Sequence, residues 1–293
     1  MEKKKILITG KGSYIGTNFI KWLQKWPSLY ETFELSVRDD EWKKHDFSFY
    51  NIVVHVAGIA HVSADPNLEQ QYYKINRDLA IEVANKAKKE NVGQFIFLSS
   101  MIVYGTDGTI GKENIITNST IPTPSDFYGK SKLEADLAIQ RLGNEKFNVV
   151  SVRTPMVYGP NCKGNFPKLN KLTDKTFIFP DIKNQRSMIF INNLCQFLKL
   201  IVDEKVTGVF HPQNKDYVCT TEIIKIMASI KNKRIFYFKI LNPILLVISR
   251  KNNFINKVFG NKVYEKSLSC YPNWNYNIVD FRNSIEQSIR RGE

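Results

Sequence analysis

The chain has 293 residues, 43% of them hydrophobic, which is enough to bury one large core or a core with a smaller lobe. Its formal net charge of +14 suits a nucleic acid, an anionic membrane surface or a polyanionic small substrate. No zinc-finger, RNA-recognition or helix-turn-helix pattern accompanies this charge, so we expect no nucleic-acid partner and favour a substrate that carries a diphosphate. The four cysteines are scattered without a CxxC pair, and therefore predict neither a metal site nor a disulfide framework.

No segment of the sequence predicts export or a membrane span. Residues 1–5 are mostly basic and lead directly into a strand-like run, without an apolar export segment. The longest apolar stretch, Phe236–Ser249, is interrupted by Lys239, Asn242 and Pro243 and is shorter than the roughly 20 residues that cross a bilayer. We therefore expect a cytoplasmic protein with reduced thiols.

Strands alternate with helices through the first half of the chain. A strand at Lys5–Thr9 leads through a glycine-rich loop into a helix that begins near Ile15. The elements expected after it are strands at Phe33–Val37 and Ile52–Val56, a helix at about Leu68–Glu90, a strand at Gln94–Leu98, a helix at about Asp126–Leu142 and a strand at Val149–Arg153. This alternation predicts an α/β fold with a Rossmann-type, doubly wound parallel sheet.

The regular alternation ends near Arg153, so we expect two parts. Residues 1–155 would form a dinucleotide-binding domain, and residues 156–293 would form mainly a smaller C-terminal substrate-binding lobe. Segments around 187–212, namely Ser187–Ile191 and Gly208–His211, are expected to return to the main sheet.

The loop Gly10-Lys11-Gly12-Ser13-Tyr14-Ile15-Gly16 joins the first strand to the first helix. Its glycines would let backbone amides approach a pyrophosphate, which the positive end of the helix dipole also favours. The loop departs from the usual fingerprint, because Ser13 stands where the middle glycine is expected. We predict a dinucleotide cofactor held by a somewhat shifted backbone.

The part of the chain that would bind the adenosine ribose is short, with room for only the strand Phe33–Val37 before the next strand. Arg38, assisted by Lys11, could meet a 2′-phosphate, whereas Asp39 could accept a hydrogen bond from a free ribose hydroxyl. The sequence favours NADP over NAD but leaves both open.

A hydroxyl, a phenol and an ammonium follow one another at Ser100, Tyr128 and Lys132. On a helix, side chains four residues apart share a face, so Lys132 would lie one turn from Tyr128 and lower its pKa. A phenol adjusted in this way can exchange protons near neutral pH. These residue types suit hydride chemistry and are the predicted catalytic group.

Taken together, these patterns resemble the extended short-chain dehydrogenase/reductase family of nucleotide-sugar epimerases, dehydratases and reductases, over about the first two-thirds of the chain. The motifs that carry the resemblance are TGKGSYIG (Thr9–Gly16), HVAG (His55–Gly58), FLSSMIVYG (Phe97–Gly105), YGKSK (Tyr128–Lys132), RTPMVYGP (Arg153–Pro160) and RSMIFINNL (Arg186–Leu194).

The resemblance implies a role for each matching residue. Ser100 would hydrogen-bond the reacting sugar oxygen, Tyr128 would exchange its proton, and Lys132 would also bind the nicotinamide ribose. The further residues implied are Val56, Ala57, Gly58 and Pro155 along the cofactor, Arg186 at the substrate diphosphate, and Asn165 and Phe166 at the nucleotide end of the substrate.

One reaction type of the family can be set aside, because Met101 and Ile102 stand where its dehydratases carry an acidic pair. Dehydration is therefore not expected. We favour a reductase of a UDP-linked 4-keto-(6-deoxy) sugar in surface polysaccharide precursor synthesis. A UDP-sugar 4-epimerase is the alternative, and a non-catalytic dinucleotide-binding regulator is a second one.

The sequence leaves two further partners open. The basic segment 231–266 is interleaved with apolar residues, which is typical of a contact with an anionic membrane surface. A homodimer is equally compatible with the sequence.

Overall fold

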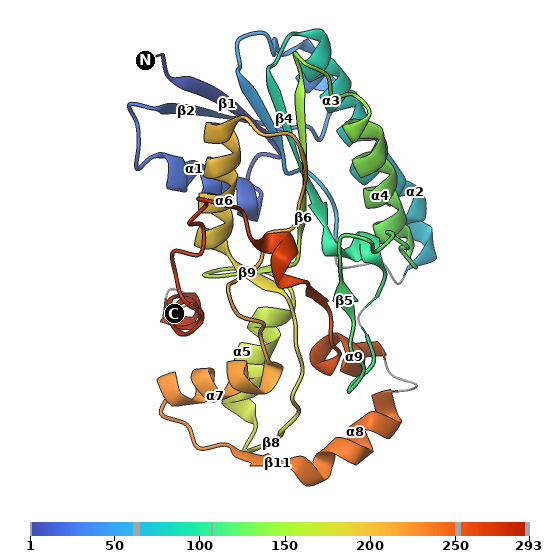
Figure 1. The fold of residues 1–293 in the computed structure, drawn as a ribbon, viewed down its shortest axis with the longest axis vertical. Coiled ribbons are helices and arrows are strands. Elements are labelled where there is room, and N and C mark those ends of the chain that lie inside the picture. Colours follow the sequence, from blue (N-terminus) through green and yellow to red (C-terminus); the bar gives the residue numbers. More distant parts are fainter. Residues whose placement is uncertain (1, 61–64, 107, 250–252, 291–293) are drawn as a thin grey trace. The chain divides into compact units, whose positions relative to one another are not determined.

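The computed structural model describes residues 2–60, 65–106, 108–249 and 253–290 (Figure 1). The chain divides into two compact units. Unit 1 comprises residues 1–105, 121–154 and 194–212, and unit 2 comprises residues 106–120, 155–193 and 213–293. The chain enters unit 2 for residues 106–120, returns to unit 1 and leaves it again after Thr154, next to the boundary near residue 155 expected from the sequence.

Unit 1 is built on a six-stranded sheet in the order β10-β6-β4-β3-β1-β2. Its strands are β1 (Lys4–Thr9), β2 (Tyr30–Leu35), β3 (Ile52–His55), β4 (Gln94–Ser100), β6 (Asn148–Thr154) and β10 (Gly208–Phe210). Every neighbouring pair is parallel. The predicted α/β fold with a doubly wound parallel sheet is confirmed.

The strand order changes direction next to β1, because β2 lies on one side of it and β3 on the other. In open α/β sheets, ligands bind outside the carboxyl ends of the strands at such a switch point. The glycine-rich loop follows β1, and Val56, Ala57 and Gly58 follow β3, so both flank this point. Only β2 lies beyond β1, in agreement with the short adenosine region expected from the sequence.

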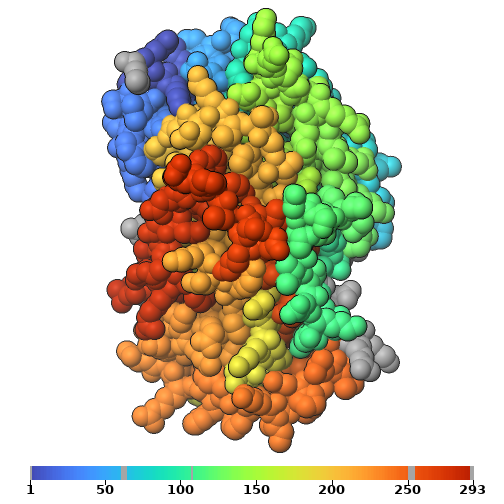
Figure 2. All heavy atoms as spheres, in the orientation of Figure 1, coloured from blue at the N-terminus to red at the C-terminus, as the bar shows by residue number. Residues whose placement is uncertain are grey.

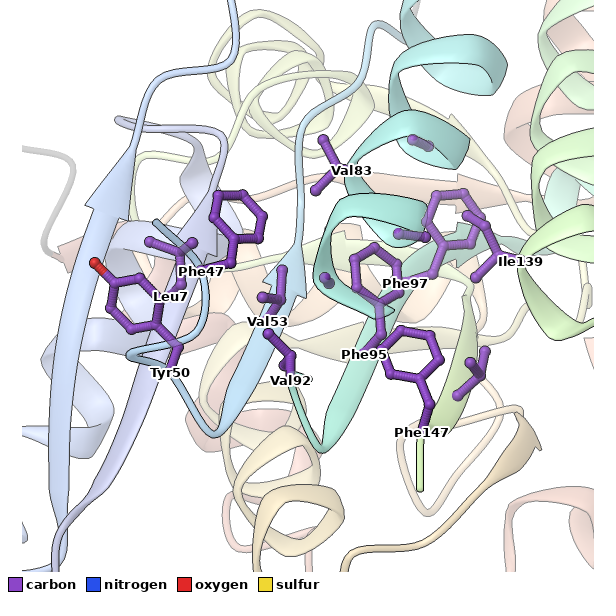
Figure 3. Packing of buried hydrophobic residues seen from close by; sticks show 14 of the residues in the cluster. Leu7, Phe47, Tyr50, Val53, Val83, Val92, Phe95, Phe97, Ile139 and Phe147 are labelled. Carbon is purple, nitrogen blue, oxygen red and sulfur yellow. The ribbon is translucent and has the colours of Figure 1, made fainter. Parts of the chain in front are cut away.

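The core of unit 1 follows from the strand register. Leu7, Val53, Phe95 and Val149 are successive partners across β1, β3, β4 and β6, so their side chains form one row on one face of the sheet. This face packs against α3 (Leu79–Lys89) and α4 (Phe127–Gln140), as Figure 3 shows for Val83 and Ile139. Helices α1 (Tyr14–Leu23) and α6 (Ile191–Glu204) lie together away from α3 and α4 (Figure 1).

The long helix expected at 68–90 is divided. Its pieces are η2 (Pro66–Leu68), α2 (Glu69–Tyr72), the π-helical turn η3 (Tyr73–Asp78) and α3. The π turn contains Asn76, whose buried side chain accepts a hydrogen bond from the Ile59 amide (2.9 Å) and donates one to the Ile59 carbonyl (3.0 Å). Such π turns are frequent at functional sites.

Unit 2 contains short parallel strand pairs and helices. The pairs are β5 (Ile115–Ile116) with β12 (Val263–Tyr264), β7 (Met156–Tyr158) with β9 (Met188–Phe190), and β8 (Ile178–Pro180) with β11 (Phe236–Phe238). The helices are α5 (Asn165–Lys175), α7 (Thr220–Ile230), α8 (Asn242–Ser249), α9 (Asn253–Phe259) and α10 (Phe281–Arg290).

Of the two segments expected to return to the main sheet, only one joins it. Gly208–Phe210 joins it beside β6, whereas Met188–Phe190 pairs with β7, the strand that begins two residues after β6 ends. Among the described residues, no helix is both long and apolar enough to span a membrane.

Candidate active site

The three predicted catalytic residues meet in unit 1. Ser100 is the last residue of β4 and caps the short helix η4 (Met101–Tyr104), where its hydroxyl accepts a hydrogen bond from the Ile102 amide at 3.3 Å. Tyr128 and Lys132 lie on the first turns of α4, and a side-chain hydrogen bond joins Ser100 to Tyr128. The sheet edge and the helix start thus bring the hydroxyl and the phenol together.

The start of α4 is fixed by a local cap. The Asp126 carboxylate accepts a hydrogen bond from the Gly129 amide at 2.7 Å, which satisfies one of the first amides of the helix. The Tyr72 ring packs edge-on against Tyr128, with the ring centroids 5.8 Å apart. Tyr128 is therefore held from both its backbone and its ring.

Burial dominates the protonation of this group. It raises the pKa of Tyr128 to about 12, against a smaller lowering by the hydrogen bond with Ser100. Burial also lowers the pKa of Lys132 to about 8, against an opposing effect of the Asp136 carboxylate. The lowering of the tyrosine pKa expected from the sequence is therefore wrong, because burial has the larger effect and the phenol holds its proton at neutral pH.

The Lys132 ammonium is directed into the sheet rather than only toward the phenol. It donates a hydrogen bond to the Leu98 carbonyl at 3.0 Å and lies 4.7 Å from the centre of the Phe97 ring. A Cβ at Gly58 would lie 3.2 Å from this nitrogen and 2.9 Å from Asn76 Oδ1. A Cβ there would displace these two side-chain ends, so the loop after β3 and the ammonium lie close together.

Asn76 is a site residue that sequence reasoning missed. Its amide fixes the backbone of Ile59, directly after Gly58, and its Nδ2 lies 3.5 Å from the Ser131 hydroxyl of α4. It therefore ties the loop after β3 to the catalytic helix. The only signal in the sequence was an asparagine within an otherwise amphipathic helix pattern, where it lowers helix propensity.

A buried ion pair behind the catalytic residues was also missed. The Asp136 carboxylate on α4 accepts hydrogen bonds from Arg153 Nε at 2.9 Å and from the Ser99 hydroxyl at 2.8 Å. Arg153 also donates to the Tyr104 hydroxyl at 2.7 Å. Tyr128, Lys132 and Asp136 recur at steps of four, and this spacing could have indicated a shared polar face.

The glycine-rich loop has the local structure that a pyrophosphate requires. Gly10 and Gly12 have φ of +118° and +75°, and a Cβ at Gly10 would lie 2.8 Å from the Ala57 amide nitrogen. Space beside Gly12 is open, since a Cβ there would meet no atom within 4 Å. The departure at Ser13 has a structural reason, because its hydroxyl caps α1 by accepting a hydrogen bond from the Gly16 amide at 3.2 Å. These residues fit a dinucleotide at the helix start.

At the expected ribose end, Arg38 and Asp39 are both exposed after β2. Asp39 caps the short helix η1 (Asp40–Lys44) by accepting from the Glu41 amide at 3.2 Å. Glu34, which sequence reasoning did not single out, lies closer to the loop: its carboxylate accepts from the Gly12 amide at 3.3 Å. A negative charge therefore stands beside the glycine-rich loop.

The remaining predicted residues belong to unit 2. Pro155 follows β6 directly, and Phe166 is buried with its ring stacked on Tyr158 at 5.1 Å. Asn165 and Arg186 line one cavity of about 500 Å³, and Arg186 Nη1 donates to the Gly260 carbonyl at 3.2 Å. Their predicted roles toward cofactor and substrate stay predictions. Among the described residues, no group of three or more His, Cys, Asp or Glu could hold a metal ion.

Comparison with known proteins agrees with this arrangement. Residues 6–218 match the family described as "NAD dependent epimerase/dehydratase family". A UDP-glucose 4-epimerase from Vibrio cholerae is 30% identical over 252 residues, which are 77% of this chain and 75% of that protein. An N-acetyl-alpha-D-glucosaminyl-diphospho-ditrans,octacis-undecaprenol 4-epimerase from Escherichia coli O157:H7 is 23% identical over 282 residues, 90% of this chain and 83% of that protein.

Solved structures share the fold at lower identity. The UDP-glucuronic acid 4-epimerase from Bacillus cereus, in complex with NAD, has a TM-score of 0.73 and 19% identity over 97% of both chains. A dTDP-4-dehydrorhamnose reductase from Clostridium acetobutylicum has a TM-score of 0.72 and 19% identity over 97% of this chain and 98% of that one.

Proposed function

Because the chain belongs to the NAD dependent epimerase/dehydratase family, we propose that it is an NAD-dependent 4-epimerase of a sugar carried on a diphosphate. The predicted membership of the extended short-chain dehydrogenase/reductase family, and the prediction of an NAD(P)-dependent epimerase or reductase, are confirmed. The sequence favoured a 4-keto reductase, but the two curated relatives named above are 4-epimerases and support the alternative better. The joining of Ser100 to Tyr128 beside Lys132 carries the proposal.

In this proposal the side chains move one proton in each direction. The loop Gly10–Gly16 would hold the cofactor, which would supply hydride transfer at sugar carbon 4. Because burial keeps the phenol protonated at neutral pH, Tyr128 must first be ionised. As the phenolate it would take the proton of the hydroxyl on that carbon and later give it back, which is general base and then general acid catalysis. Ser100 donates to the same oxygen, and the Lys132 ammonium stabilises the phenolate by its charge.

Glu34 supports NAD over the NADP that the sequence favoured. Its carboxylate lies at the glycine-rich loop, where it would repel a 2′-phosphate and can accept a hydrogen bond from a free ribose hydroxyl. The predicted contact of Arg38 with a 2′-phosphate would not be needed for NAD and stays a prediction for NADP.

The proposal is tested by replacing the phenol. Tyr128→Phe should lower kcat by about 10²-fold or more while leaving NAD binding intact, because general acid–base catalysis contributes about 10²–10⁴-fold. The matched control is Tyr73→Phe, which removes a phenol hydroxyl from a tyrosine that stacks on Arg77. Unchanged turnover in Tyr128→Phe would remove this residue from the mechanism.

Cofactor balance separates the two reactions. An epimerase interconverts the two 4-hydroxy sugars without net consumption of cofactor, whereas a reductase consumes one NAD(P)H for each 4-keto sugar. Cofactor binding without turnover of any diphospho-sugar would favour the regulator alternative.

A membrane-surface contact of segment 231–266 is a second proposal on partners. It is supported by the exposure of Ile240, Ile244 and Val247, at 78%, 57% and 65%, beside basic residues. Arg250 and Lys251 of this segment lie outside the described residues. The homodimer stays a prediction.

A further inference from the structure

Unit 2 contains a cavity whose lining is more apolar than a nucleotide-binding site would require. It has a volume of about 500 Å³, within the range of small-molecule sites, and 13 of its 18 lining residues are apolar. The apolar side chains come from α5, α7, α8 and α9 and from β8, where the buried Phe179 ring forms one wall.

Three of the five polar residues of the lining are cationic. Lys168, Arg186 and Lys257 carry positive charges, and no carboxylate is among the described residues that line the cavity. Thr220 is already engaged, because its hydroxyl donates to the Val258 carbonyl at 2.6 Å and accepts from Asn184 Nδ2 at 3.2 Å. The side chain of Asn165 is then the main polar partner left for a base edge, which has several donors and acceptors to satisfy.

We propose that this cavity binds the prenyl chain of a polyprenyl diphosphate and that its cations bind the diphosphate. The inference rests on the proposed function, since it names the carrier of the sugar whose carbon 4 is epimerised. An apolar wall with a cationic rim complements a molecule that has an apolar chain and a doubly charged head. A carrier of this kind replaces the UDP expected from the sequence.

The apolar lining continues onto the surface. Ile244 and Leu245 line the cavity, and Ile244 is also 57% exposed, so it lies where the cavity meets the surface. Leu246, Val247 and Ile248 on the same helix are 41–65% exposed. Figure 2 shows the β11–α8 segment, in orange, at the surface. A chain longer than the cavity therefore has apolar surface on which to continue.

The two-stranded sheet beside α8 repeats this arrangement. Phe179 faces the cavity, while its neighbour Ile178 and the paired Phe236 are 55% and 61% exposed. Both faces of this small sheet are thus apolar, a pattern typical of strands covered on both sides. The outer face gives the distal isoprene units a second apolar contact.

The test is equilibrium binding of farnesyl diphosphate, a short soluble probe, to the full-length protein. We expect it to bind at least tenfold more tightly than UDP or inorganic diphosphate. Ile244→Asp, which puts a charge into the cavity wall, should weaken this binding at least tenfold. Val247→Asp is the matched control, because Val247 is on the same helix and exposed but does not line the cavity, and should bind within about twofold of the wild type.

Each possible result of this binding experiment either supports or overturns the inference. Equal loss in both variants would mean adsorption to the helix surface, and UDP binding as tight as farnesyl diphosphate would mean a nucleotide site; either result overturns the inference. Turnover of a UDP-sugar without binding of farnesyl diphosphate would also overturn it and leave the proposed function intact. Farnesyl diphosphate binding that is lost only in Ile244→Asp, in a protein that turns over no diphospho-sugar, would support the inference while the proposed function fails.

Discussion

The buried ion pair between Asp136 and Arg153 should contribute far more to the stability of the protein than an exposed ion pair with the same N–O distance. The Arg153 and Asp136 side chains are only 8% and 0% exposed, and their Nε and Oδ2 atoms are 2.9 Å apart. The same helix α4 carries a second pair, Arg77 with Glu134, also at 2.9 Å, but with side chains 34% and 48% exposed. The two pairs therefore differ in burial and not in distance.

The perturbation is Asp136→Asn, compared with Glu134→Gln. Removing one partner of a buried pair leaves an uncompensated charge and costs about 3–5 kcal/mol, whereas an exposed pair contributes about 0–1 kcal/mol. Because asparagine keeps a carbonyl oxygen that can still accept from Ser99, we expect the lower end for Asp136→Asn, about 3 kcal/mol. Glu134→Gln should stay below about 1 kcal/mol.

The assay is urea unfolding at pH 7, followed by both tryptophan fluorescence and circular dichroism, since coincident curves justify a two-state free energy of unfolding. At an m value of about 2–3 kcal/mol per molar, the midpoint should fall by about 1 M or more for Asp136→Asn. Equal midpoint shifts for the two variants would refute the reasoning, because burial would then not decide the contribution of the pair.

Three further predictions follow from single side chains. Burial lowers the pKa of His55 from 6.5 to about 3, so the folded state binds fewer protons than the unfolded state between these values. The His55 contribution to the unfolding free energy should therefore fall by about 2 kcal/mol from pH 7 to pH 5, in addition to that of His211, whose pKa burial lowers to about 4. The fall should be smaller in His55→Gln, and parallel pH profiles of the two proteins would contradict this. Glu34→Gln should raise the affinity for NADP relative to NAD, whereas Glu31→Gln, exposed on the same strand, should not; equal ratios in both would exclude the carboxylate as a selector. Wild-type protein should float with anionic liposomes at low salt and less at high salt, and Val247→Asp should float less than Ile278→Asp, a change at another exposed apolar position of unit 2. Flotation that is unchanged by both substitutions would exclude the α8 surface.

Much of the fold could be predicted from the sequence, because periodicity reports local structure directly. The strand expected at Lys5–Thr9 differs from β1 by one residue at its start, and the strand expected at Val149–Arg153 differs from β6 by one residue at each end. The expected Phe33–Val37 was shifted against β2, since the polar Glu31 and Glu34 are exposed and obscure the alternation. The divided helix at 66–89 was missed because the π turn depends on the contact of Asn76 with Ile59, which is 17 residues away.

In the candidate site too, the sequence predicted features that depend on neighbouring residues but not those that depend on contacts between distant ones. The spacing of Tyr128 and Lys132 placed both on one helix, and the motif around Ser100 placed it at the end of a strand. The sequence could not give the direction of the tyrosine pKa, because that depends on how deeply the fold buries the phenol. Nor could it show Glu34 at Gly12, a contact between β2 and the loop after β1.

Helix α4 connects the stability of unit 1 to its chemistry. Tyr128, Lys132 and Asp136 recur every four residues, so they share the face that packs against β4. Each contacts a different residue of that strand: Tyr128 contacts Ser100, Lys132 the Leu98 carbonyl and Asp136 the Ser99 hydroxyl. Burial that makes the Lys132 ammonium easier to deprotonate is opposed by the Asp136 carboxylate one turn further along. The buried acid therefore helps to keep the charge of the lysine that the phenolate needs, because an ammonium without a nearby negative charge would lose its proton more readily at this depth.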